Sequence, residues 1–430
     1  MTSISPLHPS VLEAAKERPN VDLLKGKRIT LCVTGSIAAY KACELARLLV
    51  KRGARVKVVM TRSALEFVGT ATFAGITGEP VAVEMFGPDA IGESHITLSA
   101  NSDLIVVAPA TADILAKLAA GRADDLATAT ALCATSPILV APAMHPSMWE
   151  HPATRRNVEL LRTDGKVRFV GPVSGEVASG DVGLGRFADP KFIVCRIEAA
   201  LSNQDLAGRH IVVSAGPTFE DLDPVRFLGN RSTGKMGFAL AQAAALRGAR
   251  VTLIAGPSSL ETPHDVTRLD VRSALSMRTA LLQALGAGTE TADVLIMAAA
   301  VNDFRFSETQ TEKLKRSPST KIPQLAMNPD ILAEIGASRR GSVPFLVGFA
   351  VETDANQMVN FARSKLAAKR ADVIVANLAS ESFGLDQNRV TLVGADRELE
   401  LPVSSKSETA QRILDSVVQA LAARGSTGAV

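Results

Sequence analysis

The stretch APAMHPSMWE follows an apolar run and places His145 among Met144, Met148 and Trp149, the only tryptophan of the chain. A second histidine, His95, lies in GESHITLSA. An imidazole exchanges protons near neutral pH, so either histidine could act as an acid or a base. A single histidine can also be an ordinary surface or core residue, and a turn rich in Met and Trp can simply cap a core. The residue types alone leave both interpretations open.

Two further stretches carry residues that suit a phosphate group. VTGSIAAYKA offers Gly35 and Ser36 at the start of a helix-like segment, and MTRSALEFV offers Thr61 and Ser63 in the same way. Backbone N–H groups and the positive end of a helix favour an anion at such a turn. The first stretch lacks the GxGxxG dinucleotide pattern, so it predicts a single phosphate, although Ser36 is equally typical of an ordinary helix cap.

The motif GNRSTGKMG has the GxxxxGK spacing of a phosphate-binding loop through Gly229, Gly234 and Lys235. The next residue, Met236, lacks the hydroxyl that binds magnesium in such loops, and a long polar segment separates the motif from the preceding apolar run. We therefore reject a P-loop NTPase and retain only an anion-binding helix start.

The elements that must hold these residues follow one plan in both halves of the chain. Residues 28–61 read as strand, turn, amphipathic helix and strand, and residues 210–256 repeat this order, each with RGAR between helix and strand. The glycine of that tetrapeptide ends the helix. Apolar runs in 102–114, 292–304 and 371–380 suit parallel strands covered on both faces. We expect an α/β fold of two Rossmann-like domains with mainly parallel sheets, and ligands at the carboxyl ends of their strands.

Length and composition fit this plan. The chain has 430 residues, of which 47% are hydrophobic, so it is too long for one ordinary core and rich enough in apolar residues for two. We place the domain boundary in ALSNQDLAG, so the first domain covers 26–205 and the second covers 206–430. Residues 1–25 are predicted to form a flexible N-terminal extension.

Composition also argues against several classes of protein. A net charge of +3 without Lys/Arg runs gives little support to nucleic-acid binding. The four cysteines lack CxxC spacing, which argues against a zinc ribbon or a disulfide framework. The amino terminus has no apolar core of signal-peptide length, and no run in the chain reaches the length of a membrane span. We expect a cytoplasmic protein with neither nucleic-acid nor membrane partners.

The first half resembles a known family. TGSIAAYK, MTRSALEF, SHITL, APATADILAKLAAGRADDL and APAM followed by MW occur in the order found in the FMN-dependent cysteine decarboxylases, whose central member is phosphopantothenoylcysteine decarboxylase. The match spans most of residues 28–190. It implies a flavodoxin-like flavoprotein domain that binds FMN, often between the subunits of a trimer, and it implies that the loop around His145 closes over flavin and substrate. The implied FMN contacts are Gly35, Ser36, Thr61, Ser63, Ala108, Thr111 and Met144.

The same resemblance implies the chemistry. The thiol of the cysteine is first oxidised to a thioaldehyde. The electron pair that remains on carbon when CO₂ leaves can then be delocalised onto sulfur, and the reduced flavin afterwards restores the saturated thiol. The active-site histidine of the family matches His95.

The chain departs from the family at two positions. His145 stands where members commonly have a substrate-contacting asparagine, and Ser179 stands where the flap usually carries a cysteine that is thought to deliver a proton. Serine is a far weaker acid than a thiol, whose ordinary pKa is about 8.5, so Ser179 should not simply inherit that role. Our hypothesis is that His145 supplies the proton; the alternatives are water or free variation at this position.

The second half resembles phosphopantothenate–cysteine ligase through SAGPTFEDLDPVRFLGNRSTGKMG, AAAVNDF, EKLKR, NPDIL, GFAVET and FARSKLAAKRADVIVAN, over most of residues 209–400. The resemblance implies CTP, Mg²⁺ and an acyl-cytidylate that cysteine attacks. It assigns catalytic roles to Asn230 and Lys313 and a magnesium or nucleotide contact to Asp303. The other implied substrate or nucleotide contacts are Arg226, Ala298, Ala299, Ala300, Pro329, Asp330, Ile331, Leu332, Phe349, Lys365 and Lys369. Without the resemblance, EKLKR would read as an ordinary solvated face.

The two resemblances support each other, because the ligase product is the decarboxylase substrate. Together they imply a bifunctional enzyme of coenzyme A biosynthesis that acts on 4′-phosphopantothenate, cysteine and CTP, and a homo-oligomer that could be a dodecamer if a trimeric first half is joined to a dimeric ligase. Two alternatives remain open. The first half could stop at the enethiol, as Ser179 would favour, or it could serve as an FMN-binding scaffold, which His95 argues against.

Overall fold

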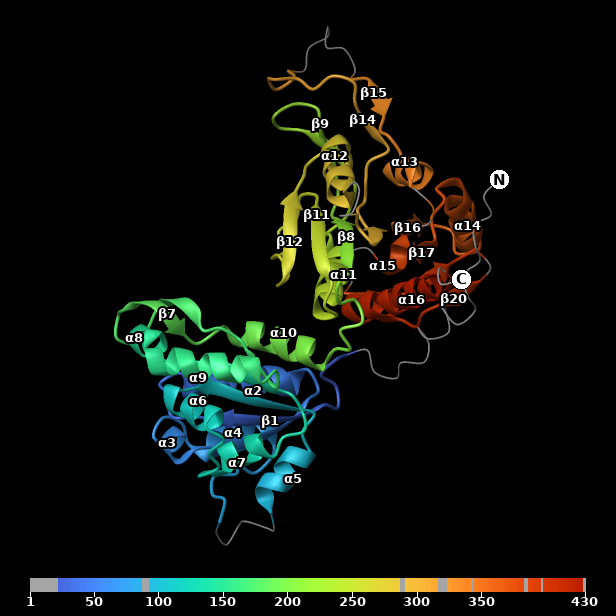
Figure 1. Ribbon diagram of the computed structural model, residues 1–430. Coiled ribbons are helices and arrows are strands. Elements are labelled where there is room, and N and C mark those ends of the chain that lie inside the picture. The colour runs from blue at the N-terminus through green and yellow to red at the C-terminus, as the bar shows by residue number, and fades with distance from the viewer. Residues whose placement is uncertain are drawn as a thin grey trace. The chain divides into compact units, whose positions relative to one another are not determined.

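The computed structural model describes residues 22–86, 93–286, 291–315, 323–339, 341, 343–382, 386–395 and 397–427. The chain divides into two compact units, one formed by Asp22–Ser202 and the other by the chain from Asn203 onward (Figure 1). Of the expected extension over 1–25, residues 1–21 lie outside the described residues, and Leu24 is fully buried. No helix in the described part of the chain is long and apolar enough to span a membrane.

The first unit is built on a five-stranded sheet of order β2-β1-β3-β4-β5 in which all neighbours are parallel. This is the strand order of flavodoxin-like folds, so the predicted fold class of this half is confirmed. The strands are β1 (Arg28–Val33), β2 (Arg55–Met60), β3 (Leu104–Ala110), β4 (Ile138–Pro142) and β5 (Val167–Phe169), and the antiparallel hairpin β6 (Val173–Glu176) and β7 (Val182–Arg186) follows them.

Helices cover both faces of this sheet because its strands are apolar on both sides. One face packs against α2, α4 and α10, with α2 in contact with both of the others, and the other face packs against α6, α7 and α9. The helices are α2 (Ala39–Lys51), α3 (Arg62–Leu65), α4 (Thr70–Thr77), α5 (Ser94–Ala100), α6 (Ala112–Ala119), α7 (Leu126–Leu132), α8 (Pro146–Glu150), α9 (Pro152–Thr163) and α10 (Pro190–Leu201).

The second unit has an eight-stranded sheet of order β12-β11-β8-β13-β16-β17-β19-β20. The strands from β12 to β17 are parallel, and their order is that of Rossmann folds, whereas β19 and β20 add an antiparallel edge. The predicted Rossmann-like fold is therefore confirmed. Its strands are β8 (His210–Ala215), β11 (Arg250–Ala255), β12 (Val266–Asp270), β13 (Val294–Met297), β16 (Phe345–Glu352), β17 (Val373–Leu378), β19 (Thr391–Val393) and β20 (Glu398–Glu400).

Two small hairpins and a further short ladder lie outside this sheet. They are formed by β9 (Phe219–Asp221) with β10 (Phe227–Gly229), β14 (Phe304–Phe306) with β15 (Leu325–Met327), and β18 (Gln387–Asn388) with β21 (Ser404–Ser405). One face of the large sheet packs against α11 and α16, and the other against α12, α13 and α14. The helices are α11 (Lys235–Leu246), α12 (Ala274–Leu285), α13 (Ile331–Ser338), α14 (Met358–Ala368), α15 (Ala379–Ser382) and α16 (Lys406–Thr427).

The RGAR tetrapeptide ends a helix in each unit, as predicted. Gly53 and Gly248 have φ angles of +79° and +88°, in the left-handed region that glycine enters without steric cost. In the second unit the preceding Arg247 is buried, and its guanidinium donates to the Asp205 carboxylate at 2.7 Å and to Asp415 at 2.8 Å. This arginine therefore joins the end of α11 to the segment before β8 and to α16.

Replacing Arg247 by Met should destabilise the second unit by about 3–5 kcal/mol, because it removes the guanidinium that pairs with the Asp415 carboxylate, whose side chain is only 4% exposed. Urea unfolding followed by circular dichroism would measure the loss. The control is Arg363→Gln, which breaks an exposed pair with Glu398 and should cost less than about 1 kcal/mol. Equal losses in both variants would contradict the prediction.

Candidate active sites

A pocket of about 650 Å³ lies at the carboxyl ends of β1, β3 and β4 in the first unit. Its walls come from the turn after β1, the starts of α2 and α6, the loop that leads from β4 into α8, and the β6–β7 hairpin. The structure thus brings predicted residues from four separate motifs to one place. Those that line the pocket are Gly35, Ser36, Thr111, Met144, His145 and Ser179.

The turn after β1 is closely packed against the loop after β2. A Cβ on Gly35 would lie under 3.0 Å from the Cβ of Ser63, so only glycine allows these two predicted loops to meet. Ser36 accepts a hydrogen bond from the Ala38 N–H at 3.2 Å within the turn before α2, whose N-cap residue is Ala38. Ser63 and Thr61 lie behind the turn and do not line the pocket, although the buried hydroxyl of Thr61 has no hydrogen-bond partner among the described residues.

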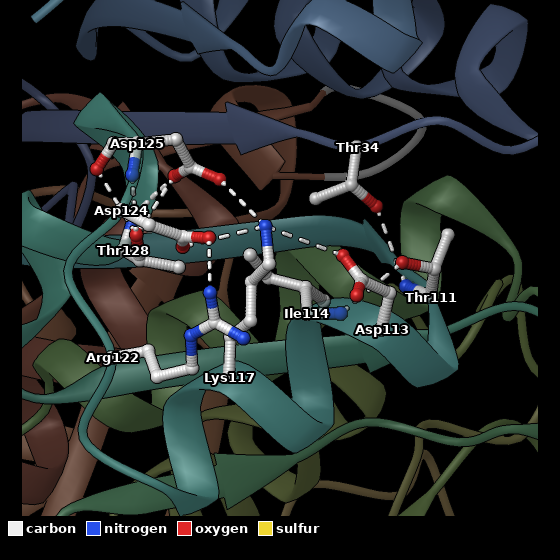
Figure 2. Close-up of polar contacts among 9 residues, drawn as sticks. All are labelled: Thr34, Thr111, Asp113, Ile114, Lys117, Arg122, Asp124, Asp125 and Thr128. Atoms are coloured by element: carbon white, nitrogen blue, oxygen red, sulfur yellow. Dashed lines mark hydrogen bonds and ion pairs between the residues drawn. The ribbon is translucent and has the colours of Figure 1, made fainter.

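The loop after β3 is fixed by hydrogen bonds to β1. The Thr34 hydroxyl donates to the Pro109 carbonyl, near the end of β3, at 2.7 Å. It also accepts from the Thr111 N–H at 3.3 Å, while the Thr111 hydroxyl accepts from the Ile114 N–H at 3.4 Å and caps α6 (Figure 2). Thr111 is therefore held at the pocket wall by its backbone. Ala108, which was also predicted to contact the flavin, is fully buried in the core.

Lys117 anchors the other end of α6 by ion pairs. Its ammonium lies 3.5 Å from Asp113, 3.4 Å from Asp124 and 3.3 Å from Asp125 (Figure 2). Burial by itself would lower the pKa of Lys117, but the attraction of these carboxylates outweighs it and raises the pKa. Asp125 also accepts from the Thr128 N–H at 2.8 Å and so caps α7. The motif APATADILAKLAAGRADDL is thus mainly a support that ties α6 and α7 together behind the pocket.

His145, Ser179 and Asp181 form one hydrogen-bonded group. His145 Nε2 and the Ser179 hydroxyl each lie 2.8 Å from the same oxygen of Asp181, and His145 Nδ1 lies 2.5 Å from the hydroxyl of Ser147. The bonds from His145 and then from Ser179 lower the pKa of the Asp181 carboxyl, so it is ionised at neutral pH. Sequence analysis missed Asp181, although an acidic residue two positions after Ser179 was a visible signal.

His95 does not line this pocket. It is half-buried in α5, whereas the pocket walls come from α2, α6, the loop before α8 and the β6–β7 hairpin. Tyr40, Lys41, Glu176 and Arg186, which sequence analysis did not single out, do line it. Two cationic side chains and one carboxylate therefore face the same space as the predicted residues.

In the second unit, the predicted residues around Asn230 meet at the carboxyl ends of β8 and β13. The Asn230 amide donates to the carbonyls of Ala300 at 3.3 Å and Val301 at 3.1 Å. The Ala300 N–H in turn donates to the Gly216 carbonyl at 2.9 Å. The loop after β8, the loop after β13 and the segment before α11 are therefore held together, and Ala298–Ala300 form part of that junction.

Asn302 was not predicted, yet it holds the same junction. It is 5% exposed, and its amide donates to the Thr218 carbonyl at 2.7 Å and to the Leu228 carbonyl at 3.2 Å. Its own N–H donates to the Thr218 hydroxyl at 2.9 Å. A buried amide that bonds to two loops suits a structural role, and AAAVNDF gave no sign of which of its residues would point inward.

Arg226 supports the loop that carries Lys313. Its guanidinium donates to Asp223 and, at 2.9 Å, to the Leu314 carbonyl, while the Leu314 N–H donates to Asp223 at 3.2 Å. The hydrogen bond from Arg226 is the main reason that the pKa of Asp223 lies well below its ordinary value. Lys313 itself is exposed, so its ammonium is accessible to an anion.

The remaining predicted nucleotide contacts lie on α13, α14, β16 and nearby loops. Lys365 and Lys369 were predicted to meet phosphates together, but each is paired with its own carboxylate, Glu352 at 2.7 Å and Asp330 at 3.2 Å. Asp303 is exposed. The others are Pro329 and Phe349, which are half-buried, and Ile331 and Leu332, which are buried. Within the described residues, no group of three or more His, Cys, Asp or Glu side chains could hold a metal ion.

Each half of the chain matches a known protein family. The Flavoprotein family matches residues 17–202, and the family of the DNA/pantothenate metabolism flavoprotein C-terminal domain matches residues 206–421. A relative from Mycobacterium tuberculosis is 46% identical, with 92% of this chain and 97% of the relative covered, and one from Bacillus subtilis is 43% identical with the same coverage. Both are named coenzyme A biosynthesis bifunctional protein CoaBC. The chain belongs to this bifunctional coenzyme A biosynthesis family.

A crystal structure of the C-terminal domain of such a protein is 36% identical to this chain, covers 51% of it and 99% of that domain, and has a TM-score of 0.44. Family membership confirms the prediction of a bifunctional enzyme of coenzyme A biosynthesis, a decarboxylase joined to a ligase. It also confirms that the first half is a flavoprotein domain.

Replacing Gly35 by Ala should empty the first unit of flavin, because the added methyl group would collide with Ser63 and push the turn away from the pocket. We expect the absorbance ratio of flavin to protein in the purified variant to fall by about tenfold or more. The matched control is Gly69→Ala, where an added Cβ meets no atom within 4 Å. Normal flavin content in the Gly35 variant would contradict the prediction.

Proposed function

We propose that the chain converts 4′-phosphopantothenate to 4′-phosphopantetheine in two steps. The second unit joins cysteine to 4′-phosphopantothenate with CTP and Mg²⁺ through an acyl-cytidylate. The first unit then uses FMN to decarboxylate 4′-phosphopantothenoylcysteine. The observation that carries the proposal is the meeting of Gly35, Thr111, Met144 and His145 in one pocket of a chain that belongs to the coenzyme A biosynthesis family.

The residues present fit FMN. The pocket is of the size that encloses a small ligand, and the turn at Gly35 and Ser36 begins a helix whose positive end suits a phosphate. Among the residues that the structure describes, the buried Thr61 hydroxyl behind that turn has no hydrogen-bond partner. Bound flavin would supply the two-electron oxidation and reduction that the thiol carbon requires. The chain's own task is to orient the substrate and to move protons.

We also propose that the pocket is completed by a second copy of the chain. His95 is the group best suited to exchange a proton during the oxidation, yet it lies on α5, away from the pocket of its own unit. A neighbouring copy that presents α5 would bring its His95 to this pocket. A trimer of first units has this property, and a dimeric ligase half would expand it to a dodecamer.

His145 remains the proposed proton donor in place of the family cysteine. It lines the pocket together with Ser179, whose hydroxyl is a poor acid, and an imidazolium can release a proton near neutral pH. If His145→Asn left formation of the saturated thiol unimpaired, this role would be wrong.

In the second unit, Lys313 is proposed to neutralise the phosphates of CTP, and Asn230 to hold the acyl-cytidylate near the loop of Ala298–Ala300. The exposure of Lys313 beside an anchored Leu314 supports this role. Mg²⁺ commonly uses one carboxylate together with phosphate oxygens, so Asp303 is sufficient as its protein ligand. Lys365 and Lys369 would have to exchange their carboxylate partners for phosphates when CTP binds.

The test is a mass spectrum of the products after flavin-loaded protein is incubated with 4′-phosphopantothenate, cysteine, CTP and Mg²⁺. We expect 4′-phosphopantetheine. Accumulation of the unsaturated enethiol would instead favour the second candidate function, a flavoprotein half that stops at this stage, for which the observation is Ser179 in place of the family cysteine. Recovery of 4′-phosphopantothenoylcysteine alone would leave only the ligase.

Replacing Lys313 by Gln should slow the ligase about 10²- to 10³-fold, because a neutral amide cannot stabilise the charge that gathers between carboxylate and triphosphate. The rate would be followed by release of pyrophosphate. The same sample supplied with 4′-phosphopantothenoylcysteine serves as the control and should decarboxylate at the normal rate. An unchanged ligase rate would remove Lys313 from the proposed site.

A further inference from the structure

The two positions at which the chain departs from the flavin-dependent decarboxylases are joined by one atom. His145 comes from the loop that leads into α8, and Ser179 from the loop of the β6–β7 hairpin, yet both lie 2.8 Å from Oδ2 of Asp181. Two side chains that share one acceptor atom must lie close together. The replacements therefore form a single unit rather than two separate changes.

The hydrogen bonds fix which nitrogen of His145 carries the proton in the neutral ring. The Ser147 N–H donates to Nδ1 at 3.2 Å, so Nδ1 is an acceptor and Nε2 bears the hydrogen that faces Asp181. When the ring becomes an imidazolium, Nδ1–H can donate to the hydroxyl oxygen of Ser147 at 2.5 Å. Both charge states therefore have partners, and Nε2–H stays directed at Asp181 in each.

The Ser179 hydroxyl donates to Asp181 and cannot replace the acidic thiol on its own. The carboxylate, in contrast, accepts hydrogen bonds from both His145 and Ser179 and so can orient the two side chains. We propose that Asp181 is a positioning residue that holds His145 Nε2–H and Ser179 at the pocket wall for the last protonation of the decarboxylase reaction. This inference rests on the proposed function of the first unit.

The conversion of the enethiol to the saturated thiol needs no covalent bond between substrate and protein. The C=C bond of the enethiol takes up one proton and one hydride equivalent and becomes the saturated thiol. The hydride equivalent would be supplied by reduced flavin bound in the pocket, and the proton comes from the His145 imidazolium, which becomes the neutral ring with its hydrogen on Nε2. Solvent then restores the imidazolium.

Asp181 is not needed to hold the hairpin in place. The Met144 N–H donates to the Gly185 carbonyl at 3.0 Å, and Gly183 and Gly185 pack so closely on Pro146 and the Met144 carbonyl that a Cβ at either glycine would collide. The Asp181 side chain is 60% exposed, so its ion pair contributes little to folding stability. A substitution at Asp181 should therefore leave the pocket intact and change only the directions of His145 and Ser179.

The first measurement tests the contact without flavin or substrate. The imidazole NMR signals of His145, assigned by their loss in His145→Asn, should shift in Asp181→Ala. They should not move in Glu150→Gln, which removes an exposed carboxylate from the same short helix α8. Unmoved His145 signals in Asp181→Ala would overturn the proposal, whatever the enzyme's activity.

The second measurement separates positioning from a structural role. With 4′-phosphopantothenoylcysteine, Asp181→Ala and Asp181→Asn should bleach the flavin absorbance and release CO₂ at close to the wild-type rate. They should form the saturated thiol about 10²-fold more slowly, so that enethiol and reduced flavin accumulate. Equal slowing of CO₂ release and thiol formation would mean that Asp181 only holds the hairpin, and the proposal would be wrong. Failure of the wild-type protein to release CO₂ would instead contradict the proposed function.

Discussion

Both candidate sites depend on the parallel pairing of the central strands. In the first unit, β1 pairs with β3 from Ile29 beside Leu104, and this register lets the Thr34 hydroxyl accept from the Thr111 N–H in the loop after β3. In the second unit, β8 pairs with β13, and the loops that follow them are joined through Ala300. Parallel strands carry their following loops to the same edge, where backbone groups no longer needed by the sheet can bind one another or a ligand. A shift of one residue in either pair would turn the loop side chains to the opposite face.

Three paired cations, Lys117, Arg247 and Arg226, support the elements that carry these loops. Lys117 ties α6 to the segment before α7, and Arg247 joins α11 to α16. Arg226 anchors the loop of Lys313 through Asp223. These partly or fully buried groups are paired, as the cost of burying a lone charge requires. Side chains left exposed at the edges, such as Lys313, are the ones that remain available to substrates.

The sequence predicted most of the fold because its signals are local. Apolar runs, the two RGAR turns and the glycine at residue 35 act within a few residues, and the structure has strands, helix ends and a tight turn at those places. Asp181 was missed because its partner His145 lies 36 residues away and on a different element. The pairing of Lys365 and Lys369 with separate carboxylates was missed for the same reason, since helical spacing shows that two lysines are neighbours but not what faces them.

The position of His95 shows a second property that the sequence alone does not predict, namely which subunit's pocket a residue serves. Its motif predicted a catalytic group, but no sequence pattern states which copy of a chain a side chain serves, and the pocket of its own unit is lined by other residues. Whether such a residue acts within one subunit or between subunits is decided by surfaces that lie far apart in the sequence.

Asn302 has a consequence for how variants of this enzyme are interpreted. Its side chain and N–H bind Thr218 and Leu228, so it acts as a staple between two loops of the ligase half. A screen that scores only growth or turnover would give variants of Asn302 and Lys313 the same score. Asn302, however, binds backbone groups of two loops, whereas Lys313 is exposed to solvent. Such a screen can separate the two only if it also records protein abundance, because a lost staple lowers the amount of folded enzyme and a lost surface charge does not.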